Sequence, residues 1–226
     1  MTTFQDIRNQ IEQLTSDIIG LSLCNHQHYP SMRNEVGQIV EVGFGKDDNL
    51  SVALKNLPYH EIYDELDRVK AYNLKMVDGA LIQMLYRFKE NHLIKHRLAF
   101  FPSPYLEEYQ NNPDIYENDE LYAEVVKKSL VPFPLRFDFD SDEDATVELD
   151  HPMSHLSLGQ YVNCRIPVSA PVAPYVFLSF ILRNFYNTVY KKYCDKIRRF
   201  NSLFTDTIVG LEKRVIHIQV PVGELI

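Results

Sequence analysis

The stretch GALIQMLYRFKENHLIKHRLAFFPSP, residues 79–104, determines the fold class of this 226-residue chain. Apolar and aromatic side chains alternate with other residues on both sides of the polar pair Glu90-Asn91. Such alternation is typical of strands that bury one face, and a short polar pair between two of them predicts a turn. Pro102 and Pro104 end the second run, because proline cannot donate a hydrogen bond within a sheet. The stretch therefore predicts a long antiparallel β-hairpin.

Further strands and helices surround this hairpin. Runs rich in β-branched and aromatic residues predict strands at residues 38–45, 49–56, 134–140, 161–169 and 214–222, of which the first two form a second hairpin. Apolar residues at spacings of three and four predict helices at residues 3–23, 58–73 and 171–204. We also expect a helix at residues 120–129. Residues 105–130 are acidic and rich in Asn and Tyr, and we expect them to pack on the same domain.

Hairpins with helices grouped at both ends, without regular βαβ alternation, predict an α+β fold. We expect a mainly antiparallel sheet built from hairpins and packed by an N-terminal helix and a long aromatic C-terminal helix. The chain is long enough to bury a substantial core without disulfides. It shows no internal repeat, so we expect a single domain over residues 1–226.

Composition restricts the function classes. The net charge of −8 argues against a general binder of the nucleic-acid backbone, which would present a basic surface. The three cysteines are not closely paired and their number is odd, which favours reduced thiols over a disulfide framework. The N-terminal residues lack the pattern of a signal peptide, and no apolar run is long enough to span a bilayer. These features predict a soluble cytoplasmic protein.

The strand RFDFD, residues 136–140, contains the first candidate site. Alternation places Asp138 and Asp140 on one face of this strand, about 7 Å apart along it. Carboxylates so placed can hold Mg²⁺ or Mn²⁺, because hard cations prefer oxygen ligands. The alternative is a solvent-facing acidic surface that continues into the acidic loop 141–144.

The loop HPMSHLSLG, residues 151–159, contains the second candidate site. His151 and His155 have the spacing that zinc hydrolases use on a helix, but Pro152 allows a helix to start only after His151. In an extended chain the two imidazoles would lie about 13 Å apart, too far for one ion. Their convergence requires a turn, for which we expect one helical turn over residues 152–156. The alternatives are a structural role for both histidines and contact with a partner.

Two arginines flank these sites within apolar surroundings. Arg136 and Arg165 would be costly to bury without partners, so we expect internal ion pairs with Asp138, Asp140 or Glu148. The alternative is that the two guanidinium groups form an anion-binding site.

A basic segment, residues 190–200, interleaves lysines and arginines with tyrosine and phenylalanine. This pattern can bind a nucleic-acid strand, and it is equally typical of an amphipathic helix with a basic outer face. The acidic chain as a whole favours the second interpretation.

The pattern RFDFD…HPMSHLSLGQYVNCRIPVSAPVAPYVFLSFILRNFY resembles the bacterial family catalogued as domain of unknown function 2290. Members are similar in an Arg-x-Asp-x-Asp strand, a His-Pro-x-x-His-Leu-x-x-Gly loop, an Arg-Ile-Pro strand and a long final aromatic helix. Residues 78–88 fit the family's central hairpin. In that pattern a second His often follows the Leu, whereas this chain has Ser157, which weakens a metal site built on a His-x-His pair. The resemblance implies an accessory protein encoded near mobile or antiviral defence genes.

No complete catalytic motif is present, while one unusual polar loop lies among apolar strands. We therefore expect a protein that binds another protein, within a bacterial defence or toxin-type module, through Arg136, Arg165, His151 and His155. One alternative is a nuclease or phosphoesterase that depends on a divalent metal (Mg, Mn or Zn). It would bind that metal with Asp138, Asp140, His151 and His155, and its catalytic candidates are His151, His155 and Asp138. A second alternative is nucleic-acid binding through residues 190–200.

Overall fold

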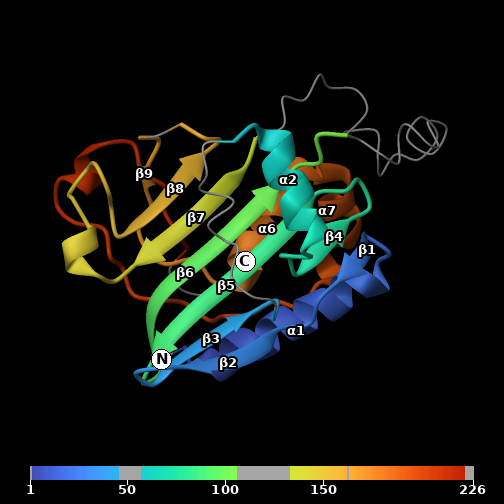
Figure 1. Ribbon diagram of the computed structural model, residues 1–226, viewed down its shortest axis with the longest axis horizontal. Helices are drawn as coiled ribbons and strands as arrows, with labels where there is room; N and C mark the ends of the chain where they lie inside the picture. The colour runs from blue at the N-terminus through green and yellow to red at the C-terminus, as the bar shows by residue number, and fades with distance from the viewer. Residues whose placement is uncertain (1, 46–56, 106–132, 162, 222–226) are drawn as a thin grey trace.

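The computed structural model describes residues 2–45, 57–105, 133–161 and 163–221 (Figure 1). Its centre is an antiparallel sheet in which nine strands are assigned among these residues. The main path is β1 (Cys24–Gln27), β4 (Leu74–Met76), β5 (Leu81–Lys89), β6 (His92–Phe101), β7 (Leu135–Asp140), β8 (Ser154–Leu158) and β9 (Ile166–Pro167). Beside it, β2 (Ser31–Glu35) pairs with β3 (Ile39–Gly43), and β3 pairs with β5.

The described helices are α1 (Phe4–Gly20), α2 (Tyr59–Arg68), α6 (Pro174–Phe185) and α7 (Asn187–Tyr193), with short 3-10 turns η2 (Glu143–Ala145), η3 (Cys194–Lys196) and η4 (Glu212–Arg214). The α+β prediction is confirmed. No helix within the described part of the chain combines the length and apolar character needed to cross a bilayer.

The central hairpin is present as predicted. β5 and β6 pair from Leu81 opposite Phe101 to Lys89 opposite His92. The turn residues Glu90 and Asn91 both have positive φ, 50° and 67°. Such values match the backbone twist that a two-residue hairpin turn requires.

The larger core lies on the face of the sheet that α1 and α6 cover. Thr3 is the N-cap of α1 and forms a reciprocal capping box with Asp6. One stripe of α1 is fully buried, as the spacing predicted, and α6 contributes a second stripe beside it. These side chains are Ile7, Ile11, Leu14, Ile18, Phe177, Leu178 and Ile181.

A smaller core lies on the opposite face, under α2. Ile62, Tyr63 and Leu66 of α2 pack with Leu81 and Phe101 from the ends of the central hairpin. Figure 1 shows α2 and α6 on opposite sides of this hairpin. Because α2 is short, it covers only one end of this face of the sheet. The other end of the same face carries polar side chains.

The predicted long C-terminal helix, residues 171–204, is wrong in extent. α6 begins at Pro174, which suits a first turn, and ends at Phe185. Tyr186 then leaves the helical conformation, with φ −131° and ψ 52°, before α7 begins. The hydroxyl of Tyr186 donates to the buried carboxylate of Asp78 at 2.9 and 2.8 Å. This contact accompanies the break.

The strands predicted nearest the C-terminus are also shorter in the structure. Among the described residues of 161–169, Ile166–Pro167 alone form a strand, β9. Residues 214–222 were expected to form a strand, but their described part makes one parallel bridge, from Ile218 to Val168. Ile218 still donates its N–H to the carbonyl of Pro167 and accepts from Ser169, so the segment lies against this part of the sheet.

Three predicted elements lie outside the described residues: the strand at 49–56, the helix at 120–129 and most of the acidic segment 105–130. The strand β2 was not predicted. It takes the place beside β3 that residues 49–56 were expected to fill.

Candidate functional site

β7 separates two chemical environments by its alternation. Phe137 and Phe139 are buried on the face that carries the larger core, whereas Arg136, Asp138 and Asp140 are half-buried on the other face. This is the predicted arrangement of the RFDFD strand. The polar face of β7 lies between β6 and β8, so residues of both neighbours surround it.

Asp138 is the centre of a compact group of charged side chains. Arg97 of β6, directly opposite Asp138, donates from Nε to Oδ1 at 3.1 Å. Arg136 approaches Oδ2 with its Nε at 3.3 Å. His155 of β8 stands directly opposite on the other side, with Nε2 3.9 Å from Oδ2. These four residues, together with Arg165, are called the arginine cluster below.

The two histidines of the loop 151–159, called the histidine loop below, converge through a turn, as expected. Residues 148–150 form a turn that joins the bridged pair Val147 and His151. The imidazole rings of His151 and His155 then lie 5.1 Å apart. The predicted helical turn over residues 152–156 is wrong, because Ser154 already pairs with β7 as the first residue of β8. A bend ahead of β8 brings the rings together instead.

Hydrogen bonding fixes the ring of His155. Its Nδ1 lies 2.8 Å from the carbonyl oxygen of Pro152, so a proton on this nitrogen gives a hydrogen bond. Its side chain is 6% exposed. Burial lowers the pKa of His155, against the opposing effects of the Pro152 carbonyl and of Asp138. A neutral ring with its proton on Nδ1 follows, with Nε2 directed towards the carboxylate of Asp138.

Like charges lie close together in the cluster. Burial opposes ionisation of Asp138, but Arg97 and Arg136 outweigh it and hold the pKa of this carboxyl below its ordinary value. Asp138 is therefore an anion in contact with two guanidinium groups, those of Arg97 and Arg136. Burial lowers the pKa of the Arg136 guanidinium, and the positive charges of Arg97 and Arg165 lower it further, although Asp138 opposes them. Three guanidinium groups thus lie close enough to oppose one another's charge in a half-buried position.

Arg136 is only partly satisfied by hydrogen bonds from the described residues. Its side chain is 16% exposed, and Nε makes no hydrogen bond within the described part of the chain, although it contacts Asp138. The predicted ion pair between Arg136 and Asp138 is present. Arg165 lies just before β9 and makes a long contact, 3.4 Å, with the carbonyl oxygen of Asp150. Glu148, another predicted partner, accepts instead from the backbone of Leu211.

The proposed metal ligands come together only in part. Asp138, His151 and His155 are neighbours, whereas the carboxylate of Asp140 binds Lys95 at 2.7 Å. No group of three His, Cys, Asp or Glu side chains in the described ranges has an arrangement that could hold a metal ion. The guanidinium groups around Asp138 would also repel a divalent cation. The metal-dependent alternative stays a prediction, and the described residues alone do not form its site.

Sequence reasoning missed Arg97. Its signal was its place in the central hairpin, where it alternates with the buried side chains His96 and Leu98 and must therefore lie on the other face. Which residue of another strand would stand opposite it depends on the order of strands in the sheet. The sequence did not give this order.

Exposed apolar side chains lie beside the cluster. Val147 and Leu149, at the turn that positions His151, are 55% and 41% exposed. Leu211, 45% exposed, is held next to them by its backbone bond to Glu148. These three residues are called the apolar rim below.

The basic segment, residues 190–200, is not one helical surface. It passes from α7 through η3 into a non-helical stretch. Arg198 pairs with an aspartate of α1 at 3.1 Å. The ammonium groups of Lys192 and Lys196 lie over the ring of Tyr193, 5.5 and 5.2 Å from its centre. Much of its positive charge is therefore engaged within the chain.

Comparison with known proteins gives one match. A family model described as an uncharacterized conserved protein, DUF2290, matches residues 23–220. No curated protein and no solved structure matches the chain. The matched range contains every strand of the sheet, the arginine cluster and the histidine loop. The chain therefore belongs to the DUF2290 family of uncharacterized conserved proteins.

Proposed function

We propose that this protein binds another protein by receiving an acidic side chain of that partner in the arginine cluster. The observation that carries the proposal is a cluster of like charges: two guanidinium groups converge on the half-buried carboxylate of Asp138, and Arg165 adds a third positive charge near Arg136. Burying like charges together is unfavourable, and an incoming carboxylate relieves this cost. Arginine is suited to this role because its planar fork can bind a carboxylate through two hydrogen bonds.

The surroundings of the cluster favour a protein over a nucleic acid as the partner. Arg97, Arg136 and Asp138 are 16–17% exposed, which suits one inserted side chain better than a continuous phosphate backbone. The apolar rim supplies the second part of a protein interface, because the buried core of such an interface is depleted of charged residues other than arginine and is more apolar than its edge. The family resemblance is the support for placing the partner in a bacterial defence or toxin-type module.

Photo-crosslinking tests this proposal. A photoreactive amino acid at position 149, in the apolar rim, should crosslink a protein in extracts of the native host, whereas the same group at Arg8 on α1 should not. Arg165→Glu should reduce the crosslinked yield at position 149 by about tenfold, as expected when a charge pair worth roughly 1.4 kcal/mol is lost. The matched charge reversal Lys191→Glu, in the basic segment, should leave the yield unchanged.

Two results would overturn the proposal. Crosslinked material that a nuclease removes would identify a nucleic acid as the partner of this face. Equal yields from the wild type and Arg165→Glu, with both proteins folded, would mean that the cluster does not contribute to binding. When the crosslinked protein is identified, reversing the charge of its contacting acidic residue should restore binding to Arg165→Glu.

A further inference from the structure

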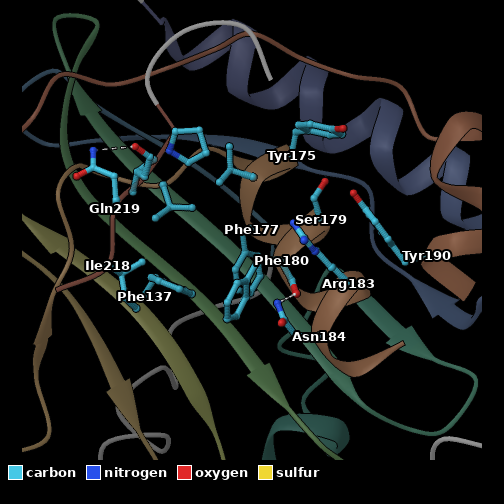
Figure 2. A pocket seen from close by; sticks show the side chains of 14 residues that line it. Phe137, Tyr175, Phe177, Ser179, Phe180, Arg183, Asn184, Tyr190, Ile218 and Gln219 are labelled. Atoms are coloured by element: carbon cyan, nitrogen blue, oxygen red, sulfur yellow. Dashed lines mark hydrogen bonds between the residues drawn. The ribbon is translucent and has the colours of Figure 1, made fainter. Parts of the chain in front are cut away.

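A second candidate site lies on the opposite face of the same strand. Asp138 of β7 belongs to the arginine cluster. Its neighbour in sequence, Phe137, lines a cavity bordered by α6, α7 and the C-terminal segment (Figure 2). The cavity has a volume of about 480 Å³. Small-molecule sites typically have volumes of roughly 300–1,000 Å³. The cavity therefore has the size to enclose most of a small organic molecule.

The base of the cavity is aromatic. The ring of Phe137 meets those of Phe177 and Phe180 edge-on, with centroids 6.1 and 5.4 Å apart and interplanar angles of 79° and 89°. Ile218 and Val220 form another wall, and the N–H of Val220 is held by the Ser169 hydroxyl at 2.8 Å. Aromatic rings favour offset or edge-to-face contact with another ring, so this base suits a flat aromatic ligand.

One wall of the cavity is polar. Ser179 and Arg183 are four residues apart on α6 and so share a face, and Tyr190 of α7 lies next to them in Figure 2. Arg183 is exposed and forms no ion pair with any described residue. Within the same described part of the chain, the hydroxyls of Ser179 and Tyr190 also make no hydrogen bond. A cation and two hydroxyl donors are thus available at this wall.

Helix stability offers a simpler explanation for the position of Arg183. Arg183 lies in the last turn of α6, where a cation stabilises the helix dipole. That role requires a charge near the helix end, but it requires neither a neighbouring cavity nor hydroxyl groups without hydrogen-bond partners. The combination of aromatic base, cation and hydroxyls goes beyond what helix stability explains.

We propose that this cavity binds a small aromatic carboxylate. Its ring lies against Phe180 and the exposed edge of Phe137, above the fully buried Phe177. Its carboxylate pairs with Arg183 and accepts hydrogen bonds from Ser179 and Tyr190. Charge complementarity selects an anion, because the described residues that line the cavity include a cation and no acidic side chain. The site is independent of the arginine cluster, from which the sheet separates it.

Titration calorimetry of the whole chain with naphthoate, and with neutral naphthylmethanol as a matched probe, tests this proposal. The wild type should bind one naphthoate per chain and bind naphthylmethanol more weakly. Arg183→Gln should weaken naphthoate binding about tenfold and leave naphthylmethanol binding unchanged. Arg68→Gln removes an exposed arginine from α2, on the other face of the sheet, and should change neither affinity.

Filling the cavity supplies an independent test. Ser179→Phe should abolish binding of both probes without lowering the melting temperature, and Val176→Phe serves in its place if the first variant does not fold. The proposal is overturned if neither probe binds the wild type at millimolar concentration, or if the filled variants bind as the wild type does. Equal affinity for the charged and neutral probes would mean that the cavity is apolar without anion selectivity, which also overturns it.

Discussion

At the scale of single residues, His96 shows how burial sets a pH response. It lies in β6, where its Nε2 accepts the backbone N–H of Val172 at 3.0 Å. Its ring packs against Tyr86 and Phe139, with centroids 5.5 and 5.8 Å away. Burial lowers the pKa of His96 to about 4, and the opposing charge of Asp138 does not offset this effect. The folded protein therefore holds His96 neutral at a pH where the unfolded chain already protonates it.

This difference predicts a loss of stability in mild acid. The unfolded chain takes up a proton near pH 6.5 and the folded protein only near pH 4, so the contribution of His96 is complete above pH 6.5 and declines as the pH falls towards 4. Each pH unit in this window should lower the free energy of unfolding by about 1.4 kcal/mol. His96→Gln should flatten the decline in urea titrations at successive pH values. The exposed His92→Gln should leave it intact, and an equal slope in all three proteins would contradict the assignment.

The polar residues of the candidate site were predictable to the extent that they depend on neighbours in sequence. Alternation along β7 placed Asp138 on the polar face, and burial of Arg136 in an apolar run predicted their ion pair. The contact of Arg97 with Asp138 and the convergence of His151 with His155 could be predicted only in part. They depend on which strands are neighbours and on a bend with no helical or strand periodicity.

At the scale of elements, Tyr186 illustrates why local periodicity overestimated a helix. Spacings of three and four continue across this residue, since Leu182, Tyr186 and Val189 are all buried. Periodicity cannot reveal that Asp78, more than one hundred residues away, is buried and needs a donor. The hairpin of β5 and β6 was predictable because both its strands and its turn are encoded within 26 consecutive residues. Elements stabilised by distant contacts were not.

The bond between Tyr186 and Asp78 gives a prediction at this scale. Burial raises the pKa of Asp78, while the Ala80 N–H and the Tyr186 hydroxyl oppose this effect. Tyr186→Phe leaves the carboxyl with one fewer partner and should lower the free energy of unfolding by about 1–3 kcal/mol in urea titration. The exposed Tyr161→Phe should have no effect. The role of the bond is refuted if Tyr186→Phe is as stable as the wild type, or if Asp78→Asn and Tyr186→Phe have additive effects.

At the scale of the whole molecule, one sheet carries two cores and two candidate sites. Adjacent residues of β5 belong to different cores, because Leu81 packs under α2 and Ile82 packs with α1 and α6. The same division on β7 directs Asp138 to the arginine cluster and Phe137 to the cavity. Neither core can lose its packing without disturbing strands that the other core also uses.

This sharing predicts that the described helices and strands unfold as one cooperative unit, as the single domain expected over residues 1–226 requires. Ile11→Ala should open the larger core and Leu66→Ala the smaller one, since both side chains are fully buried. Each should lower the free energy of unfolding by about 2–5 kcal/mol. In urea titrations followed by far-UV and near-UV circular dichroism, the two signals should stay coincident in the wild type and in both variants. If Leu66→Ala instead produced an early transition that left the far-UV signal of α1 and α6 intact, the core under α2 would be a separate folding unit.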